Sequence, residues 1–420
     1  MAFDKKTLVA VAGSPDIHYV KENPLELFER VTAAEVAAME GTVMAAEAWK
    51  GDKVNLCGVL RTLDAGLINV TYQVSDLVSD AGYRIGAGQV AVWFQKYVKA
   101  SVGSPISQQY NSCKYIPPYE EIADILYTQG AVNLPARFVQ PVWFLVSVPA
   151  DAFAGTYRGT VTFTAASGDT VSLDIELTVK NAVLPARETW HYDMEIFHWP
   201  GSFLHDAGYA EEDFYKPEVL ETLRDHYRRL YEAGCNTAWA LMIEGFKTGI
   251  KYKDHNGPQV KWLLHKDGTV DFDFADFCNW VPFMRSIGFT KFVCDGLCPG
   301  WRGWCMTDAD TGEDVVMSIT ATDPAWKGYV AQFLRAMFAV CEERGWSDMM
   351  LIHIDERPYD ELRELIDVIN EITNGKFRVS LATNHSNMDI PILDEVPSLS
   401  INVNLVNDIT RPQTRRRRRR

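Results

Sequence analysis

Two adjacent acids at the end of an apolar run are the residues of this chain best suited to chemistry. Residues 349–354 are apolar apart from His353, and Asp355 and Glu356 follow them directly. Such a run predicts a buried strand, and a helical pattern begins by Tyr359. Acids at the carboxyl end of a strand form the active sites of α/β barrels. An Asp N-cap followed by a first-turn Glu explains the same two residues equally well.

Cleavage of a glycosidic bond is one reaction that such a pair could carry out. Most glycosidases place two carboxylates on separate strands, ~5–9 Å apart, and neighbouring residues cannot easily flank a bond in that way. In substrate-assisted hydrolysis the 2-acetamido oxygen of the sugar attacks the anomeric carbon instead. One carboxylate then protonates the leaving oxygen while its neighbour holds the acetamido N–H. The dyad Asp355-Glu356 therefore suits 2-acetamido sugars.

The elements that position the dyad alternate between strands and helices. This alternation predicts a parallel sheet, either open or closed into a barrel. A glycine-rich phosphate loop follows none of the strands, which disfavours a nucleotide site. A (β/α)8 TIM barrel needs eight strands, so we expect an incomplete barrel of about six β/α units in a chain truncated at its C-terminal side. The candidate strands are 190–198, 237–243, 291–297, 349–355, 377–383 and 398–404.

The first part of the chain is β-rich. Residues 171–179 alternate between apolar and polar side chains, which is typical of a half-buried strand, and the turn 167–169 joins it to a strand near 157–163. Together with further strands at 54–61, 68–75, 90–100 and 142–148, this pattern predicts a β-sandwich. Pro185 marks its end. We therefore predict a sandwich domain over 1–185, a barrel domain over 186–410 and an arginine-rich tail over 411–420 that is unstructured or artefactual.

Composition excludes several classes of function. The net charge of −15, despite six arginines at 415–420, argues against a nucleic-acid partner. No stretch is long and apolar enough for a signal peptide or a membrane span, so a cytoplasmic location is the default. The eight cysteines lack the spacing of a disulfide framework or a zinc site, which predicts free thiols and no metal. They are Cys57, Cys113, Cys235, Cys278, Cys294, Cys298, Cys305 and Cys341. No cofactor is expected.

Several short motifs follow one another along the chain in a recognisable order. They are Gln140-Pro141-Val142-Trp143, Val148-Pro149, the stretch 154–161, Leu184-Pro185, the stretch 190–199, Asp267-Gly268 and Asp271-Phe272. Together with Asp355-Glu356 they make the chain resemble glycoside hydrolase family 123, retaining β-N-acetylgalactosaminidases. The resemblance covers roughly residues 40–405.

The resemblance implies roles for the dyad and a class of substrate. Glu356 would be the general acid/base, and Asp355 would orient the acetamido group; Arg357 stands where Pro often follows the Glu in this family. The expected partner is an oligosaccharide or glycoconjugate with a terminal β-linked N-acetylgalactosamine (β-GalNAc). Oligomeric state is left open. Further residues near the predicted carboxyl ends of the strands are candidate sugar contacts, with Trp301 and Trp304 as a stacking platform on a loop. These candidates are His198, Trp199, Glu244, Trp301, Trp304, Asn384 and His385.

For each of these candidates a structural role is at least as good an explanation. A lone His often satisfies a buried hydrogen bond, and a Trp often packs a loop. His353, inside the strand, could orient Asp355 or fill a core layer. Two other functions also remain open. One is an enzyme that prefers N-acetylglucosamine (GlcNAc), and the other is a non-catalytic glycan-binding protein.

Overall fold

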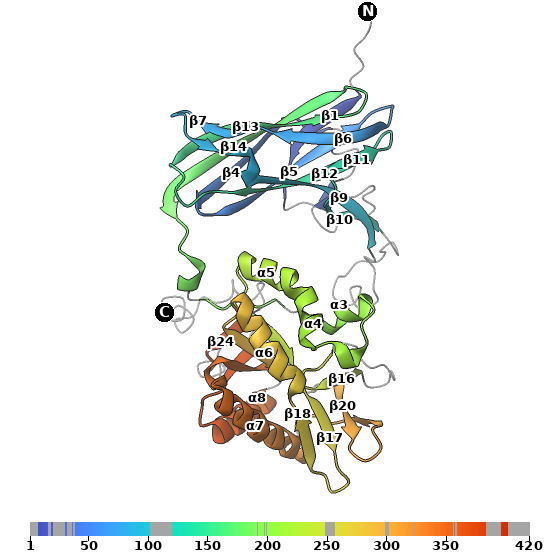
Figure 1. The fold of residues 1–420 in the computed structure, drawn as a ribbon, viewed down its shortest axis with the longest axis vertical. Coiled ribbons are helices and arrows are strands. Elements are labelled where there is room, and N and C mark those ends of the chain that lie inside the picture. Colours follow the sequence, from blue (N-terminus) through green and yellow to red (C-terminus); the bar gives the residue numbers. More distant parts are fainter. Residues whose placement is uncertain are drawn as a thin grey trace, which may run out of the picture. The chain divides into compact units, whose positions relative to one another are not determined.

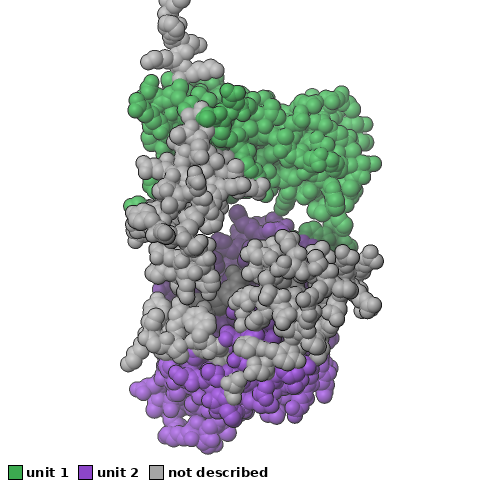
Figure 2. All heavy atoms as spheres, turned by 180° about the vertical axis from the view of Figure 1, so that it is seen from behind, with its two compact units in different colours: residues 1–190 green, residues 191–420 purple. Residues whose placement is uncertain are grey.

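The computed structural model of the chain contains two compact units, Met1–Trp190 and His191–Arg420 (Figure 2). Each unit has a hydrophobic core of its own. The sequence placed a boundary five residues earlier, after residue 185. The structure describes residues 7–15, 18–19, 30–31, 36, 38–100, 120–190, 192–196, 198, 200–247, 257–298, 302–321, 323–355, 357, 359–383 and 396–401.

Unit 1 consists mainly of two β-sheets. The first sheet is antiparallel throughout and has the strand order β1-β5-β12-β9-β10. The second has the order β11-β6-β13-β14-β4, with β7 paired to β13 and β8 paired to β7. In the second sheet β4 runs parallel to β14, while the other main strands are antiparallel. Figure 1 shows both sheets.

The strands predicted for unit 1 are present, with bounds that differ from the predicted ones by up to four residues. The strands at 54–61, 68–75, 90–100 and 142–148 are confirmed as β5, β6, β9 and β12, and the hairpin around 167–169 as β13 and β14. The first sheet contains β1 (Leu8–Gly13), β5 (Lys53–Thr62), β9 (Val90–Ala100), β10 (Glu120–Tyr127) and β12 (Val139–Ser147). The second contains β4 (Val43–Lys50), β6 (Leu67–Val74), β7 (Leu77–Ser79), β8 (Arg84–Ile85), β11 (Ala131–Leu134), β13 (Gly155–Thr164) and β14 (Thr170–Val183). A separate pair consists of β2 (His18–Tyr19) and β3 (Arg30–Val31), and η1 spans Ala87–Gln89.

The two sheets of unit 1 face each other across one core. Three apolar residues of β14, Leu173, Ile175 and Leu177, are fully buried, and they share a cluster with Phe144 of β12 in the other sheet. At Gly58 of β5 the sheets approach closely, because a Cβ added there would lie 2.2 Å from Leu173 Cδ1. This layered arrangement is the predicted sandwich.

Unit 2 is built on a parallel sheet whose strands are neighbours in the order of the chain. The order is β15-β19-β22-β23-β24, and every pairing is parallel. A parallel bridge between Glu195 and Thr237 places the first predicted strand segment beside β15. The strands are β15 (Thr237–Leu241), β19 (Lys291–Asp295), β22 (Met350–Asp355), β23 (Arg378–Thr383) and β24 (Ser398–Ile401). All six predicted segments thus take part in parallel pairing.

Helices follow these strands in the sequence and pack on one face of the sheet. α7 begins where the Asp323 carboxylate accepts the N–H of Ala325 at 2.9 Å, and it ends at Gly345, whose φ of 68° suits glycine. Its apolar residues lie in the main core of unit 2 with those of the other helices. The helices are α3 (Pro200–Asp206), α4 (Pro217–Leu220), α5 (Arg224–Ala233), α6 (Ala275–Ile287), α7 (Pro324–Arg344) and α8 (Tyr359–Thr373), with 3-10 turns η3 (Glu211–Asp213), η4 (Glu221–Leu223) and η5 (Ser347–Met349). A further 3-10 turn, η2 (Arg187–Thr189), lies at the end of unit 1.

A small second sheet in unit 2 was not predicted. It has the order β16-β20-β17-β18, with β21 paired to β20. The strands are β16 (Glu244–Lys247), β17 (Lys261–Leu264), β18 (Val270–Asp273), β20 (Arg302–Asp308) and β21 (Asp314–Met317). Within the described ranges the parallel sheet has two free ends, so closure into an eight-stranded barrel stays a prediction. Among the same residues, no helix combines the length and the apolar character needed to cross a bilayer.

Candidate functional site

The parallel sheet of unit 2 has an apolar face and a second, more polar face. Cys294 and Ile352 are fully buried in the main core that the helices share. Residues one position before or after them point to the opposite side, because side chains alternate along a strand. There the register pairs Val293 with both Trp239 and Leu351, and these three residues form a small cluster of their own. This cluster is the floor of the polar face.

His353 lies on the same face, two residues beyond Leu351. It is buried, and its ring meets that of Trp239 edge-on at a centroid distance of 5.0 Å. Its Nδ1 lies 3.4 Å from Ser380 Oγ on the neighbouring strand β23. His353 therefore occupies a layer between the apolar floor and the strand end at Asp355.

Acids gather above this layer. Asp295 is the last residue of β19 and Asp355 the last residue of β22, and Asp355 is exposed. Glu195, which bridges to the start of β15, is half-buried. Burial raises the pKa of Glu195, an electrostatic interaction with His353 opposes that rise, and the carboxylates of Asp295 and Asp193 add to it. Glu195 therefore interacts electrostatically with both His353 and Asp295.

Cys298 lies just beyond β19, and its thiol is affected by the carboxylates at the ends of both β19 and β22. Burial raises the pKa of its thiol to about 12, while Arg357 acts to lower it and the carboxylates of Asp295 and Asp355 to raise it. Its Sγ is 4.0 Å from the Glu361 carboxylate. The thiol stays protonated at neutral pH, so Cys298 is unsuited to act as a nucleophile. The seven cysteines that the structure describes are free thiols, as predicted.

The arrangement at the polar face favours the stabilisation of positive charge. Asp295 and Asp355 end neighbouring parallel strands on the same face, and Glu195 adds a third carboxyl group nearby. A surplus of carboxylates stabilises a cationic intermediate and raises the pKa of any further acid placed beside them. Both effects are useful to an acid catalyst that works next to a developing cation.

His198 lies in the core of unit 2. Its Nε2 accepts the backbone N–H of Trp239 at 3.4 Å, and its Nδ1 lies 3.1 Å from the hydroxyl of Tyr227. Burial lowers the pKa of His198 to about 4, so the ring is neutral at physiological pH. These contacts match the structural role that was open for His198, that of a histidine with satisfied hydrogen bonds.

The structure corrects the prediction that Trp304 stands on a loop as a stacking platform. Trp304 lies within strand β20, and its side chain is only 1% exposed. Its indole N–H donates to the carbonyl of Gly296 at 2.9 Å, and its ring packs at 5.5 Å from that of Trp262. The apolar indole is therefore part of the core, where a sugar cannot reach it.

The remaining predicted contacts are not placed by the structure. Glu244 begins β16, but its side chain lies outside what the structure describes. The other residues lie outside the described ranges altogether. They are Glu356, Trp199, Trp301, Asn384 and His385.

Sequence reasoning missed Glu195 and Asp295. The signal for Asp295 was available, because it ends the apolar run 292–294 and is followed by Gly296, in the same way that Asp355 ends its own run. Gly296 has a φ of 97°, which turns the chain sharply at the strand end. Glu195 could have been found as an acid in the first candidate strand, between Met194 and Ile196.

Acids at the strand ends of a parallel sheet, in a chain that also contains a sandwich unit, are the features that the sequence led us to expect of a glycoside hydrolase. Two family models match the chain and together cover most of it. The catalytic domain of glycoside hydrolase 123 matches residues 207–420, and the N-terminal domain of glycoside hydrolase 123 matches residues 12–165. The chain belongs to glycoside hydrolase family 123.

A solved structure has the same fold over nearly the whole chain. It is a family 123 glycoside hydrolase from Clostridium perfringens, studied for glycolipid glycan hydrolysis, with 23% identity and a TM-score of 0.82. The match covers 95% of this chain and 67% of that one. The PapD-like domain 7 of human CEP192 is far less similar, with 12% identity, a TM-score of 0.18, and coverage of 34% of this chain and 84% of that one. A search of curated proteins gave no match.

Proposed function

We propose that this protein removes terminal β-linked GalNAc by a retaining, substrate-assisted mechanism. Glu356 is the general acid/base and Asp355 the residue that holds the acetamido group. The observation that carries the proposal is the position of Asp355, exposed at the carboxyl end of the parallel strand β22 and followed directly by Glu356. Membership of family 123 supports the reaction class.

The proposed reaction has two steps. In the first, the acetamido oxygen attacks the anomeric carbon, the glycosidic bond breaks, and Glu356 gives its proton to the leaving oxygen. Asp355 accepts a hydrogen bond from the acetamido N–H and stabilises the positive charge of the oxazolinium ion. In the second step, water attacks the anomeric carbon, Glu356 takes up its proton, and the acetamido group is restored. Two inversions at one carbon leave the product with the β configuration.

The charge pattern of the polar face supports this division of roles. Glu356 must carry a proton at the start of the reaction, and neighbouring carboxylates disfavour its ionisation. Asp355 is adjacent in the chain, and Asp295 ends the next strand. The same carboxylates attract the oxazolinium cation. His353 and Glu195, lower on this face, act as positioning residues that keep the strand ends in place.

We also propose that the parallel strands form part of a (β/α)8 barrel and that its carboxyl face holds the sugar. Trp199, Glu244, Trp301, Asn384 and His385 would supply contacts there. The Clostridium perfringens enzyme, studied for glycolipid glycan hydrolysis, suggests a glycolipid or another glycoconjugate as the donor of the GalNAc residue.

The test measures release of the aryl group from aryl β-GalNAc and aryl β-GlcNAc by the full chain. Glu356→Gln and Asp355→Asn are each expected to lower kcat by about 10²–10⁴-fold, because each removes a group that acts in the transition state. Glu364→Gln is the matched control, since Glu364 is an exposed residue of α8 that pairs with Lys327. NMR of the first product formed should show the β anomer.

Several outcomes would overturn the proposal. Normal turnover by Glu356→Gln would remove Glu356 from the acid/base role, and a first product in the α configuration would exclude retention. Faster cleavage of aryl β-GlcNAc would change the substrate to GlcNAc. If the parent chain bound a GalNAc-derived thiazoline, a stable mimic of the oxazolinium ion, but released no aryl group, the protein would be a glycan-binding protein without turnover.

A further inference from the structure

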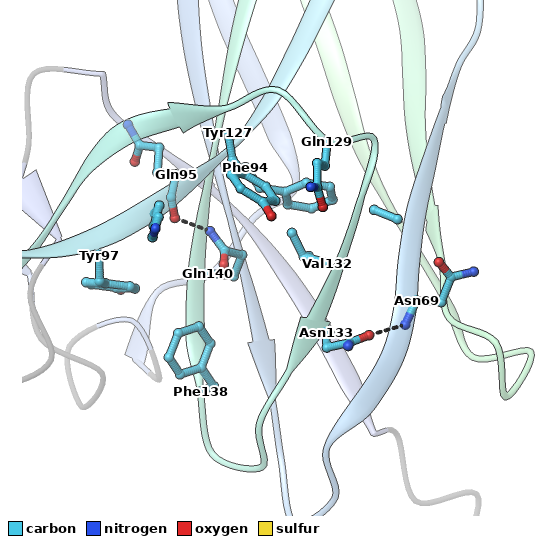
Figure 3. A pocket seen from close by; sticks show the side chains of 12 residues that line it. Asn69, Phe94, Gln95, Tyr97, Tyr127, Gln129, Val132, Asn133, Phe138 and Gln140 are labelled. Carbon is cyan, nitrogen blue, oxygen red and sulfur yellow. Dashed lines mark hydrogen bonds between the residues drawn. The ribbon is translucent and has the colours of Figure 1, made fainter. Parts of the chain in front are cut away.

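A cavity of about 560 Å³ lies in unit 1, where the edge strands of the two sheets meet (Figure 3). β10 is the edge strand of the first sheet and β11 that of the second, and the short connection 128–130 joins them. β6, β9 and β12 complete the walls. The volume falls within the range of ~300–1,000 Å³ that is common for small-molecule sites.

Five side-chain amides line this cavity, and two of them are held in fixed orientations. The Nε2 of Gln140 donates to the carbonyls of Gln95 at 2.7 Å and Pro141 at 2.8 Å. Because both amide hydrogens are used, Gln140 contributes its Oε1 as an acceptor. The Oδ1 of Asn133 accepts the backbone N–H of Asn69 at 2.8 Å, which leaves the Nδ2 of Asn133 as a donor. Figure 3 shows the contact between Gln140 and Gln95 and the contact between Asn133 and Asn69 as dashed lines.

Three more side-chain amides, those of Asn69, Gln95 and Gln129, complete this set. Gln129 is exposed on the connection between β10 and β11, so it is free to adjust to a ligand. Gln140 is only 5% exposed, which means that its amide is fixed before any ligand arrives. Fixed donors and acceptors reduce the entropy lost on binding.

Four aromatic side chains share the lining with these amides. Phe94 is almost fully buried, while Tyr127, Tyr97 and Phe138 are half-buried. Tyr97 donates from its hydroxyl to the carbonyl of Val139 at 2.9 Å, and its ring meets that of Phe138 at 5.6 Å and 74°. The rings are therefore held in place, and they offer apolar surface between the amides.

This combination selects a neutral ligand with many hydroxyl groups. Lys96 is the charged residue among those that line the cavity, so an anionic ligand would find little countercharge. A purely apolar ligand would leave the amides without hydrogen-bond partners, at a cost for each buried group. A sugar ring fits both requirements, because its hydroxyls pair with amides and its C–H faces pack on aromatic rings.

We propose that the sandwich unit carries a carbohydrate-binding site in this cavity, which takes a neutral sugar residue of a glycan. The site is separate from the acids of unit 2 and requires no hydrolysis. Its role is to hold glycan chains while their termini are processed elsewhere in the protein.

The test is calorimetric titration of the full chain with the methyl β-glycosides of glucose, galactose, mannose, GlcNAc and GalNAc. At least one should bind with a Kd in the millimolar range or tighter. Gln129→Ala is expected to weaken binding about 3- to 10-fold through loss of a hydrogen bond. Tyr127→Leu is expected to weaken it about tenfold through loss of the aromatic face. Thr128→Ala, an exposed neighbour outside the lining, is the matched control and should bind as the parent does.

Each titration is repeated with the Glu356→Gln chain, and cleavage of aryl β-GalNAc is measured for the cavity variants. Binding that Gln129→Ala and Tyr127→Leu weaken in both backgrounds, with cleavage unchanged, supports the site in the sandwich. The proposal is overturned if no glycoside of the panel binds the parent at millimolar concentrations, or if Gln129→Ala and Tyr127→Leu chains with native circular dichroism bind as tightly as the parent. Neither result bears on catalysis by Glu356, so the two proposals fail separately.

Discussion

The burial of Trp304 leads to a sharp prediction, because it distinguishes a core residue from a sugar contact. Trp304→Phe keeps an aromatic ring but removes the indole N–H that donates to Gly296 at 2.9 Å. It also shortens a side chain that packs against Trp262. We expect this variant to be less stable than the parent and to bind substrate equally well, since only 1% of the Trp304 side chain is exposed.

The expected loss of stability follows from these two changes. The hydrogen bond contributes about 1 kcal/mol. Phe is roughly 40 Å³ smaller than Trp, and at ~24 cal/mol per Å³ of cavity this adds about 1 kcal/mol. The free energy of unfolding should therefore fall by about 2 kcal/mol, which for a urea m-value of ~2 kcal/mol per M lowers the midpoint by about 1 M.

Urea unfolding followed by circular dichroism measures this change, and the KM for aryl β-GalNAc measures substrate binding. Val316→Ala is the control, because Val316 lies on β21 opposite Cys305, next to Trp304, but is 46% exposed. Its free energy of unfolding should change by no more than the ~0.5 kcal/mol typical of surface changes, which is a midpoint shift of at most about 0.25 M at the same m-value. An unchanged midpoint for Trp304→Phe together with a tenfold rise in KM would refute the core assignment and restore the stacking platform.

Three further predictions concern stability. Burial lowers the pKa of His198 to about 4, so the folded state should lose up to about 3 kcal/mol of stability as the pH falls from ~6.5 to ~4. In His198→Asn this loss, measured as a shift of the urea midpoint with pH, should vanish. Burial raises the pKa of Glu195, so its ionisation disfavours the folded state as the pH rises through that pKa. Glu195→Gln should therefore gain stability relative to the parent between pH 4 and 7, and a constant difference would contradict this. Gly58→Ala should cost ~1–3 kcal/mol because its Cβ would lie 2.2 Å from Leu173, whereas Gly86→Ala, with open space around it, should be close to neutral in the same thermal unfolding assay.

The long elements of the fold were predictable from the sequence because their patterns are local. The alternation of apolar and polar residues over 171–179 lies within one strand, β14, and Leu173 and Leu177 are buried, as this alternation requires. The apolar runs at 291–297 and 349–355 are likewise the strands β19 and β22. Such patterns need only the side-chain period and one buried face.

The small sheet of unit 2 was not predictable in this way. β16, β17, β18 and β21 have four residues each, which is too short for a period to emerge. Some of their pairings join segments that are distant in the chain, as when Glu244 pairs with Cys305. Trp304 was expected on a loop because one of its strand partners, Gly245, lies about 60 residues earlier, and the other, Met317, belongs to a four-residue strand.

The candidate site was predictable only in part, for a related reason. Asp355 was found because its run ends on two acids in succession, whereas the single acid of Asp295 gave a weaker signal. The surroundings of Glu195 depend on strand adjacency, since its pKa responds to His353 and Asp295 from other strands. A carboxyl group acquires such neighbours only when the sheet has formed.

The parallel pairing of β4 with β14 has a consequence for the order in which the chain folds. Asp174 lies opposite Val43, so β4 pairs with a strand about 130 residues later in the chain. The long segment between the two strands must close into a loop before they can pair. In unit 2, by contrast, each parallel strand lies beside the one that preceded it in the chain. During synthesis from the N-terminus, unit 1 cannot complete its second sheet until β14 has left the ribosome, while unit 2 can add strands as they emerge. The second sheet of unit 1 is therefore completed only when a long loop closes, whereas the parallel sheet of unit 2 is extended one strand at a time.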